Sequence, residues 1–297
     1  MAKNKVSERH KNRKEAPVAK GKILAIGGKE DRGQRELKEE QKRNKDFVSQ
    51  EILKRFVQEL QGSKPMVAIV PTASSLPDEM VKDYTQVFKE LGIENIEVLN
   101  ISNRTDVKDP AYLDIVERSA GILMTGGDQL KLTSIFGGTK VLQLMKERHT
   151  YDDIIIAGTS AGAAALSTPM IYEGETIGGY IKGDVRITTG LEFIKDVCID
   201  THFIQRDRIV RMAQAISTNP GCIGIGLEED TAILITEGYN MEVLGSGLVT
   251  IVDGIGITST NIYEVETGEP FSVRDLKVHL LSKGERYVFP TYDQLHI

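Results

Sequence analysis

Short apolar runs alternate along the chain with longer amphipathic segments. Five runs are almost continuously apolar, at Lys22–Ile26, Met66–Val70, 96–99, Gly121–Met124 and 154–157. Such runs are typical of strands that are buried on both faces. Three segments between the runs place most of their apolar residues on one helical face, at 47–60, 78–91 and 138–148. Strand, small-residue turn and helix in repeated order predict an α/β fold, a parallel sheet flanked by helices on both sides.

Glycine-rich turns follow three of the apolar runs, at Gly27, Gly126 and Gly158. Ligand sites of parallel sheets form at the carboxyl ends of the strands, so we expect the functional site beside these turns. From about Thr231, shorter alternating runs predict hairpins that extend the same sheet. The polar segment 29–46 is expected at the surface. We therefore expect one α/β domain over residues 22–297.

Composition narrows the classes of protein that the chain can represent. The 297 residues contain two cysteines, Cys198 and Cys222, which form neither a disulfide framework nor a metal-ligand spacing. No run approaches the roughly 20 apolar residues that a membrane span needs. The N-terminus lacks the apolar stretch of a secretion signal. We expect a cytoplasmic protein that has no membrane partner and binds no metal.

Charge is distributed unevenly between the N-terminus and the rest of the chain. Residues 1–22 carry a net charge of +6, whereas the whole chain carries −6, so the remainder carries −12. An acidic body argues against nucleic acid as a partner. Residues 1–21 are expected to form a basic, disordered leader.

The segment 158–162 (GTSAG) is the most informative stretch of the sequence. It has the G-x-S-x-G spacing of a nucleophile elbow, with a predicted strand before it and an alanine-rich predicted helix after it. A cramped turn makes the Ser160 hydroxyl project from the sheet, and flanking glycines allow the strand and the helix to approach closely. The Ala161 amide, at the helix start, then faces a developing oxyanion. The alternative is an ordinary tight turn in which Ser160 only caps the helix.

A serine nucleophile needs a general base, and the chain has five histidines. His10 and His296 lie near the termini, His149 follows a charged helix end, and His279 lies in a strand-like run. His202 is the best candidate, because it follows an apolar run where a loop begins.

The base in turn needs an acid that orients its ring. Three adjacent acids, Glu228, Glu229 and Asp230, end another apolar run. The residue pattern alone does not choose among the three.

Several motifs together resemble the cyanophycinase family in order and spacing. They are 26–31 (IGGKED), 126–129 (GGDQ), 158–163 (GTSAGA), 200–203 (DTHF), 205–211 (QRDRIVR) and 224–232 (GIGLEEDTA). The resemblance implies a fold similar to class I glutamine amidotransferases and a serine-type peptidase. It implies cyanophycin as substrate, a polyaspartate with arginine on each β-carboxyl, from which β-Asp-Arg dipeptides are released. It also implies a homodimer and no cofactor.

Carried over by position, the resemblance makes Ser160 the nucleophile, His202 the base and Glu229 the orienting acid. We hypothesise an acyl-enzyme on Ser160, with the backbone amides of Gly127 and Ala161 binding the oxyanion. The residues that fall where the family lines its substrate pocket are Gln129, Asp200, Thr201, Arg206, Arg208 and Arg211. Clustered arginines suit a substrate that carries carboxylates, because a guanidinium binds a carboxylate through two hydrogen bonds.

Two positions depart from the family pattern. Thr201 stands where members of the family carry glutamine, and Glu228 stands where they carry aspartate, which makes Glu228 a rival orienting acid. Two further functions therefore stay open, an α-aspartyl dipeptidase and a non-catalytic amidotransferase-like binding module. A nucleotide-binding protein is disfavoured, because neither Gly27-Gly28 nor Gly126-Gly127 completes a phosphate-binding motif.

Overall fold

The structure, a computed structural model, describes residues 17–33, 36, 39–174 and 179–290. Most of the predicted leader, with His10, lies outside the described residues, and so does His296. Across the described ranges, no helix has the length and apolar character that a membrane span requires.

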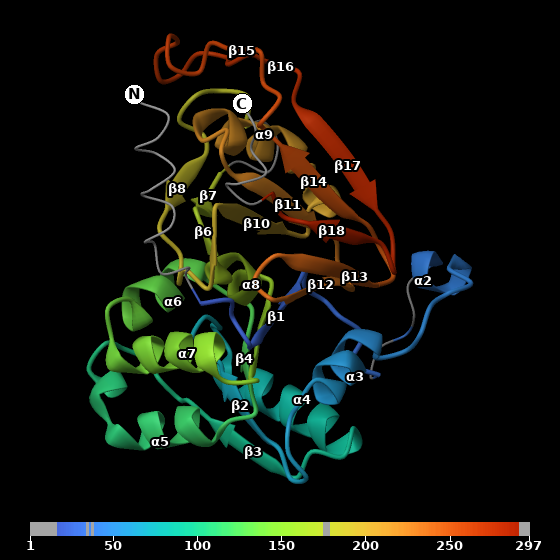
Figure 1. The fold of residues 1–297 in the computed structure, drawn as a ribbon, viewed down its shortest axis with the longest axis vertical. Coiled ribbons are helices and arrows are strands. Elements are labelled where there is room, and N and C mark those ends of the chain that lie inside the picture. Colours follow the sequence, from blue (N-terminus) through green and yellow to red (C-terminus); the bar gives the residue numbers. More distant parts are fainter. Residues whose placement is uncertain (1–16, 34–35, 37–38, 175–178, 291–297) are drawn as a thin grey trace, which may run out of the picture.

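The larger sheet of the described chain has eight strands (Figure 1). In spatial order they are β18 (Arg286–Val288), β13 (Asn240–Gly245), β12 (Thr231–Thr236), β1 (Lys22–Ile26), β5 (Ile155–Thr159), β4 (Gly121–Met124), β2 (Met66–Val70) and β3 (Asn95–Val98). Five neighbouring strands, β1, β5, β4, β2 and β3, are parallel to one another. The other three, β12, β13 and β18, are added to the edge at β1 through antiparallel pairs. All five predicted parallel strands are present, and the α/β fold class is confirmed.

Helices cover both faces of the parallel strands, as the unbroken apolar runs predict. The helices are α2 (Glu39–Arg43), α3 (Glu51–Gln58), α4 (Pro77–Glu90), α5 (Pro110–Arg118), α6 (Gln129–Phe136), α7 (Lys140–Tyr151), α8 (Ala161–Leu166) and α9 (Ile209–Thr218), with 3-10 turns at Asp106–Lys108 and Ile204–Arg206. In β1, Leu24 and Ile26 pack with residues of α3 and α4, whereas Ile23 and Ala25 pack with residues of α6 and α7. Figure 1 shows α3 and α4 on one side of the strands and α5, α6 and α7 on the other.

A second sheet packs against the first on the side of α8. Its six strands are β17 (Lys277–Leu281), β14 (Val249–Asp253), β11 (Ile223–Leu227), β10 (Val197–Thr201), β6 (Ser167–Thr168) and β9 (Ile194–Lys195). The apolar residues of β10, β11 and β14 join the same core cluster as those of α8 and β1. On the outer face of this sheet, α9 packs Met212 and Ile216 against Cys198 and Val252.

Three alternating runs after Thr231, at 232–235, 241–245 and 247–252, were expected to extend the first sheet. The expectation is confirmed for the first two runs. Strands β12 and β13 extend the sheet beyond β1. The third run forms β14, which instead pairs with β11 and β17 in the second sheet. An alternating pattern identifies a strand with one buried face, but it does not identify the sheet that the strand joins.

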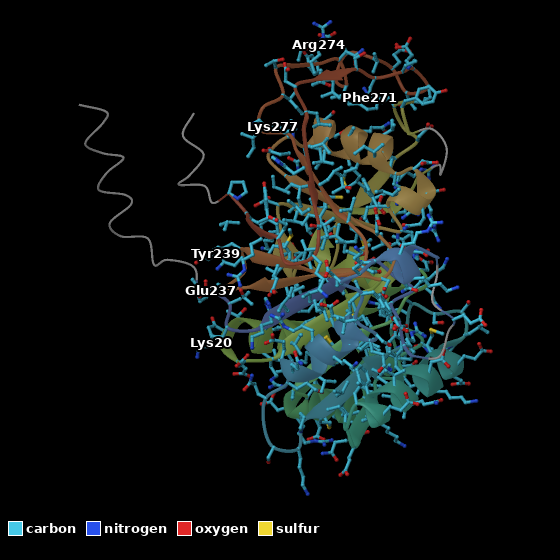
Figure 2. All side chains as sticks on the ribbon, turned by 90° about the vertical axis from the view of Figure 1, so that its right-hand side faces the viewer. Lys20, Glu237, Tyr239, Phe271, Arg274 and Lys277 are labelled. Carbon is cyan, nitrogen blue, oxygen red and sulfur yellow. The ribbon has the colours of Figure 1, made fainter. Side chains whose placement is uncertain are left out.

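Two small antiparallel units complete the described strands, β7 (Met170–Glu173) with β8 (Arg186–Thr188), and β15 (Ser259–Thr260) with β16 (Val273–Arg274). Figure 2 shows Phe271 and Arg274 at the end of the molecule, far from the turn between β12 and β13 that carries Glu237 and Tyr239. Strands β1 and β4 lie in the middle of the molecule and below, away from the β15–β16 unit at its top (Figure 1).

Candidate active site

The turn after β1 binds three segments that carry candidate catalytic residues. The backbone amide of Ser160 donates to Ile26 O at 2.9 Å, that of His202 donates to Gly27 O at 3.2 Å, and that of Asp230 donates to Gly28 O at 2.9 Å. Ser160 follows β5, the neighbour of β1 in the first sheet, whereas His202 and Asp230 follow β10 and β11 of the second sheet. The turn after β1 therefore joins segments from both sheets at one site.

Ser160 occupies a strained turn between β5 and α8. Its backbone angles, φ 51° and ψ −113°, lie outside the regions that side-chain-bearing residues usually adopt. The flanking glycines allow the close approach that the motif predicts. A Cβ on Gly158 would lie 2.4 Å from the carbonyl carbon of Gly162, and a Cβ on Gly162 would lie 2.3 Å from the Met124 carbonyl oxygen. The strand–turn–helix context expected around Ser160 is therefore present.

Ser160, His202 and Glu229 form a continuous chain of hydrogen bonds. Ser160 Oγ lies 2.9 Å from His202 Nε2, and His202 Nδ1 lies 2.8 Å from Glu229 Oε1. The imidazole and the carboxylate are both buried, with side-chain exposures of 8% and 7%. Glu228, the rival acid, makes no hydrogen bond to His202 within the described chain. This geometry is that of a nucleophile, a base and an orienting acid.

The surroundings of His202 favour the neutral form of its ring. Burial lowers the pKa of His202 from its usual value near 6.5, and the positive charges of Arg206 and Arg208 lower it as well, while Glu229 acts in the opposite direction. Gly28 leaves room for the ring, because a Cβ there would lie 2.6 Å from the imidazole Cε1. A neutral imidazole is the form that accepts a proton from a serine hydroxyl.

His149, which the sequence places beside the charged end of a helix, is buried. It lies at the end of α7 with 6% of its surface exposed, and its ring meets that of Phe193 edge-on. Burial lowers the pKa of His149 to about 4. This histidine belongs to the core.

Two backbone amides near Ser160 are candidates for an oxyanion hole. Neither Gly127 N nor Ala161 N donates a hydrogen bond to another described residue. Gly127 has φ +142°, and a Cβ there would lie 2.0 Å from the Ala73 carbonyl oxygen, so only glycine fits. Both amides thus stay available beside the serine.

Three of the predicted substrate-pocket residues, Asp200, Arg208 and Arg211, are joined by ion pairs. Arg211 holds Asp200 through two hydrogen bonds, from Nε at 2.7 Å and from NH2 at 2.5 Å. Arg208 donates to Asp200 at 2.8 Å and to the Thr201 carbonyl oxygen at 2.6 Å. Burial lowers the pKa of Arg208 to about 10. Asp200 is therefore already neutralised by two arginines of this chain.

The other three predicted pocket residues have different surroundings. Gln129 begins α6, and its amide nitrogen donates to the carbonyl oxygen of Ile171 at 3.1 Å. Thr201 is 4% exposed at the end of β10. Arg206 is exposed and forms no ion pair with any residue in the described ranges. Their contact with a substrate stays a prediction.

Comparisons with known proteins agree with this arrangement. The model of peptidase family S51 matches residues 41–243. The chain belongs to peptidase family S51. Two relatives named cyanophycinase are similar to it over most of their length. The protein from Synechococcus elongatus is 34% identical over 277 residues, which cover 93% of this chain and 82% of that protein. The protein from Geminocystis herdmanii is 33% identical over 273 residues, 92% of this chain and 95% of that protein.

Solved structures share the fold of this S51 peptidase. A peptidase from an acI-B1 actinobacterium aligns with a TM-score of 0.64 and 22% identity, over 92% of this chain and 98% of that one. A putative peptidase E from Listeria monocytogenes EGD-e aligns with a TM-score of 0.50 and 18% identity, over 76% of this chain and 98% of that one. The predicted resemblance and the assignment to the peptidases are confirmed.

A network of buried polar side chains contacts Thr159, the residue directly before Ser160. The sequence of this S51 peptidase did not predict the network. Thr159 Oγ1 donates to Glu30 Oε2 at 2.7 Å, and the Tyr84 hydroxyl donates to the other oxygen of Glu30. Arg32 adds hydrogen bonds to Glu30 at 3.2 Å and to the Tyr84 hydroxyl at 2.9 Å. Glu30 is 2% exposed, so the expectation of a surface segment at 29–46 is wrong at this residue. The hydrogen bond from Thr159 to Glu30 thus holds the side chain next to Ser160 in place.

The turn after β1 also brings a cation to the acid of the triad. Lys29 Nζ lies 2.8 Å from Glu229 Oε1, and the Lys29 side chain is 54% exposed. The sequence offered one signal for both findings, the polar run KED directly after a buried strand at the expected site edge.

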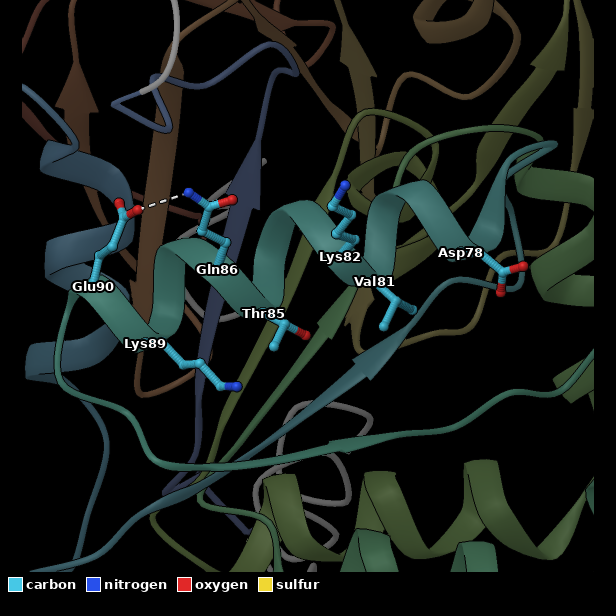
Figure 3. A pocket seen from close by; sticks show the side chains of 7 residues that line it. All are labelled: Asp78, Val81, Lys82, Thr85, Gln86, Lys89 and Glu90. Carbon is cyan, nitrogen blue, oxygen red and sulfur yellow. Dashed lines mark hydrogen bonds between the residues drawn. The ribbon is translucent and has the colours of Figure 1, made fainter.

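One hollow of the described surface is formed by a single helix. The hollow in Figure 3 is lined by seven side chains of α4 alone, among which Gln86 donates to Glu90 at 3.0 Å. A ligand site collects polar groups from several elements, which this helix face does not. Within the part of the chain that the structure describes, no cluster of His, Cys, Asp and Glu has the arrangement of a metal site.

Proposed function

We propose that the protein is a serine-type exopeptidase that hydrolyses cyanophycin to β-Asp-Arg dipeptides through an acyl-enzyme on Ser160. The observation that carries the proposal is the Ser160–His202–Glu229 chain, with distances of 2.9 and 2.8 Å, in a member of peptidase family S51. Membership of a peptidase family favours catalysis over the non-catalytic binding module.

In the proposed reaction, Ser160 Oγ attacks a backbone carbonyl while His202 Nε2 accepts its proton. Glu229 holds the ring through Nδ1–H and stabilises the imidazolium. The amides of Gly127 and Ala161 donate to the oxyanion, and each such donor lowers the barrier by about 3 kcal/mol. The imidazolium then protonates the leaving amine, and water hydrolyses the acyl-enzyme.

Two observations support cyanophycin as the substrate. The relatives from Synechococcus elongatus and Geminocystis herdmanii are named cyanophycinase. Arg206 is exposed, and its backbone amide donates to the His202 carbonyl oxygen at 3.1 Å, which places the arginine beside the triad. Its guanidinium suits the free carboxylates of an arginyl polyaspartate.

The pairing of Asp200 favours a second candidate, an α-aspartyl dipeptidase. A carboxylate in the substrate pocket suits the guanidinium of an arginyl substrate, but Arg208 and Arg211 already occupy the oxygens of Asp200. A dipeptidase that recognises the aspartyl carboxylate has no need of a free acid at this position.

The substrate assignment is tested by following product release from purified cyanophycin beside a panel of α- and β-aspartyl dipeptides. We expect β-Asp-Arg from cyanophycin and no comparable turnover of the dipeptides. Faster turnover of α-aspartyl dipeptides would replace the first candidate with the second. Absence of hydrolysis of every substrate would refute both.

The proposed base predicts an acid limb in the pH profile of kcat/KM. Because the pKa of His202 is lowered, the neutral ring persists below pH 6.5, and activity is lost as the pH falls through the lowered value. We expect the midpoint of the limb below about 6.5, with kcat/KM falling about tenfold per pH unit beneath it. A midpoint above this value, measured on the unmodified enzyme, would contradict His202 as the base.

A further inference from the structure

Lys29 contacts the triad through its acid, Glu229. Its ammonium and the His202 ring share one oxygen of the acid, because both Lys29 Nζ and His202 Nδ1 lie 2.8 Å from Glu229 Oε1. The carboxylate is 7% exposed, whereas the lysine side chain is 54% exposed. A buried carboxylate therefore has a solvent-facing cation as its second partner.

The backbone holds Lys29 in place for this contact. Lys29 has φ 47°, a left-handed conformation that is uncommon for a residue with a side chain. Ser160, His202 and Asp230 also have positive φ, between 51° and 52°. Such backbone strain gathers at functional sites, where the surrounding structure maintains it. The turn that binds the three catalytic segments thus also directs the lysine to the acid.

The charge of Lys29 opposes the effect of Glu229 on the imidazole. Three charged groups act on the His202 ring directly: Glu229 in the turn between β11 and β12, Arg206 in a 3-10 turn, and Arg208 just before α9. Lys29, in the turn after β1, acts on the ring indirectly, through its contact with Glu229. Among these described groups the Glu229 carboxylate alone favours the imidazolium, and a cation in contact with the carboxylate reduces this stabilisation.

We propose that Lys29 is a positioning residue of the triad, which fixes the Glu229 carboxylate against the imidazole and offsets its charge so that the base stays neutral in mildly acidic solution. The proposal rests on the proposed function for its catalytic meaning. It assigns to this lysine the specific task of setting the pH at which the base becomes protonated.

The test is an NMR titration of the His202 Cε1 proton in the intact protein, for the wild type and for Lys29→Met. Loss of the cation is expected to raise the His202 pKa by about 0.5 to 1 pH unit, three- to tenfold more imidazolium at a given mildly acidic pH. The acid limb of kcat/KM should move upward by the same amount. The His202 resonance is identified by its loss in His202→Asn.

Two further variants separate this role from a merely structural one. Lys29→Arg keeps the charge and is expected to titrate as the wild type does. Lys146→Met removes another partly exposed lysine, one that pairs with Glu192 at 3.0 Å from α7, and should leave the His202 titration unchanged. A shift below about 0.2 pH unit in Lys29→Met, or an equal shift in Lys29→Arg, would overturn the proposal.

The titration needs no substrate, so its failure is distinguishable from failure of the proposed function. If no aspartyl substrate is hydrolysed while Lys29→Met still moves the titration, the proposed function fails and the effect of Lys29 on the base stands. If hydrolysis depends on Ser160 while the titration stays fixed, the inference about Lys29 fails alone.

Discussion

Ser160→Ala is expected to lower kcat for the peptide substrate by about 10⁴- to 10⁶-fold, with little change in KM. The variant loses the nucleophile but keeps the amides of Gly127 and Ala161, so some stabilisation of the transition state remains. The Ser160 hydroxyl is not among the proposed substrate-binding groups, so KM is expected to change little. The measurement is the steady-state rate of dipeptide release from cyanophycin, beside mass spectrometry of the protein after treatment with a serine-directed phosphonate.

Ser119→Ala is the matched control for this variant. Its hydroxyl donates to the Ile115 carbonyl oxygen at 2.7 Å, at the end of α5 and far from the triad. This variant should keep kcat within about twofold of the wild type. Retention of more than about a tenth of the activity by Ser160→Ala, or phosphonate labelling of a different residue, would remove Ser160 from the mechanism.

The parallel half of the sheet is predictable because both of its faces are buried. In β1, Ile23 and Ala25 belong to one apolar cluster and Leu24 and Ile26 to the other, so the run 23–26 is apolar throughout and stands out in the sequence. Strand β14 was assigned to the wrong sheet, because antiparallel strands of both sheets show the same alternation of apolar and polar residues. Hydrophobic pattern identifies elements, and long-range pairing then decides their neighbours.

Some features of the candidate site depend on residues adjacent in sequence, and others depend on contacts between distant residues. The turn at Ser160 is encoded by adjacent residues, so its motif and its geometry agree. The contact of Lys29 with Glu229 joins residues 200 positions apart and exists because β1 pairs with β12. The burial of Glu30 is likewise hidden within a segment that is polar in sequence. No local pattern contains either fact.

For Asp200, the structure indicates a structural role in addition to the substrate-binding role that its motif predicts. The sequence places it among substrate-binding residues, whereas the structure shows its carboxylate held by Arg208 and Arg211 between β10 and α9. The Asp200 side chain is 4% exposed, and the two arginines are 12% and 7% exposed. A buried anion between a buried arginine, Arg211, and a partly buried one, Arg208, ties the second sheet to the helix that covers it.

Asp200→Asn is therefore expected to lower the free energy of unfolding by about 3 to 5 kcal/mol, because it leaves two buried guanidinium groups without an anion. Urea denaturation of the variant and the wild type measures this difference. Asp114→Asn is the matched control, since it breaks an ion pair with Arg118 whose side chains are 65% and 51% exposed, and a change below about 0.5 kcal/mol is expected. If Asp200→Asn unfolds as the wild type does but raises KM for cyanophycin, the carboxylate acts on the substrate rather than on the fold. A loss of stability with KM unchanged in the folded variant would instead make Asp200 a residue that supports the pocket, and would leave Arg206 as the charged side chain that meets the substrate.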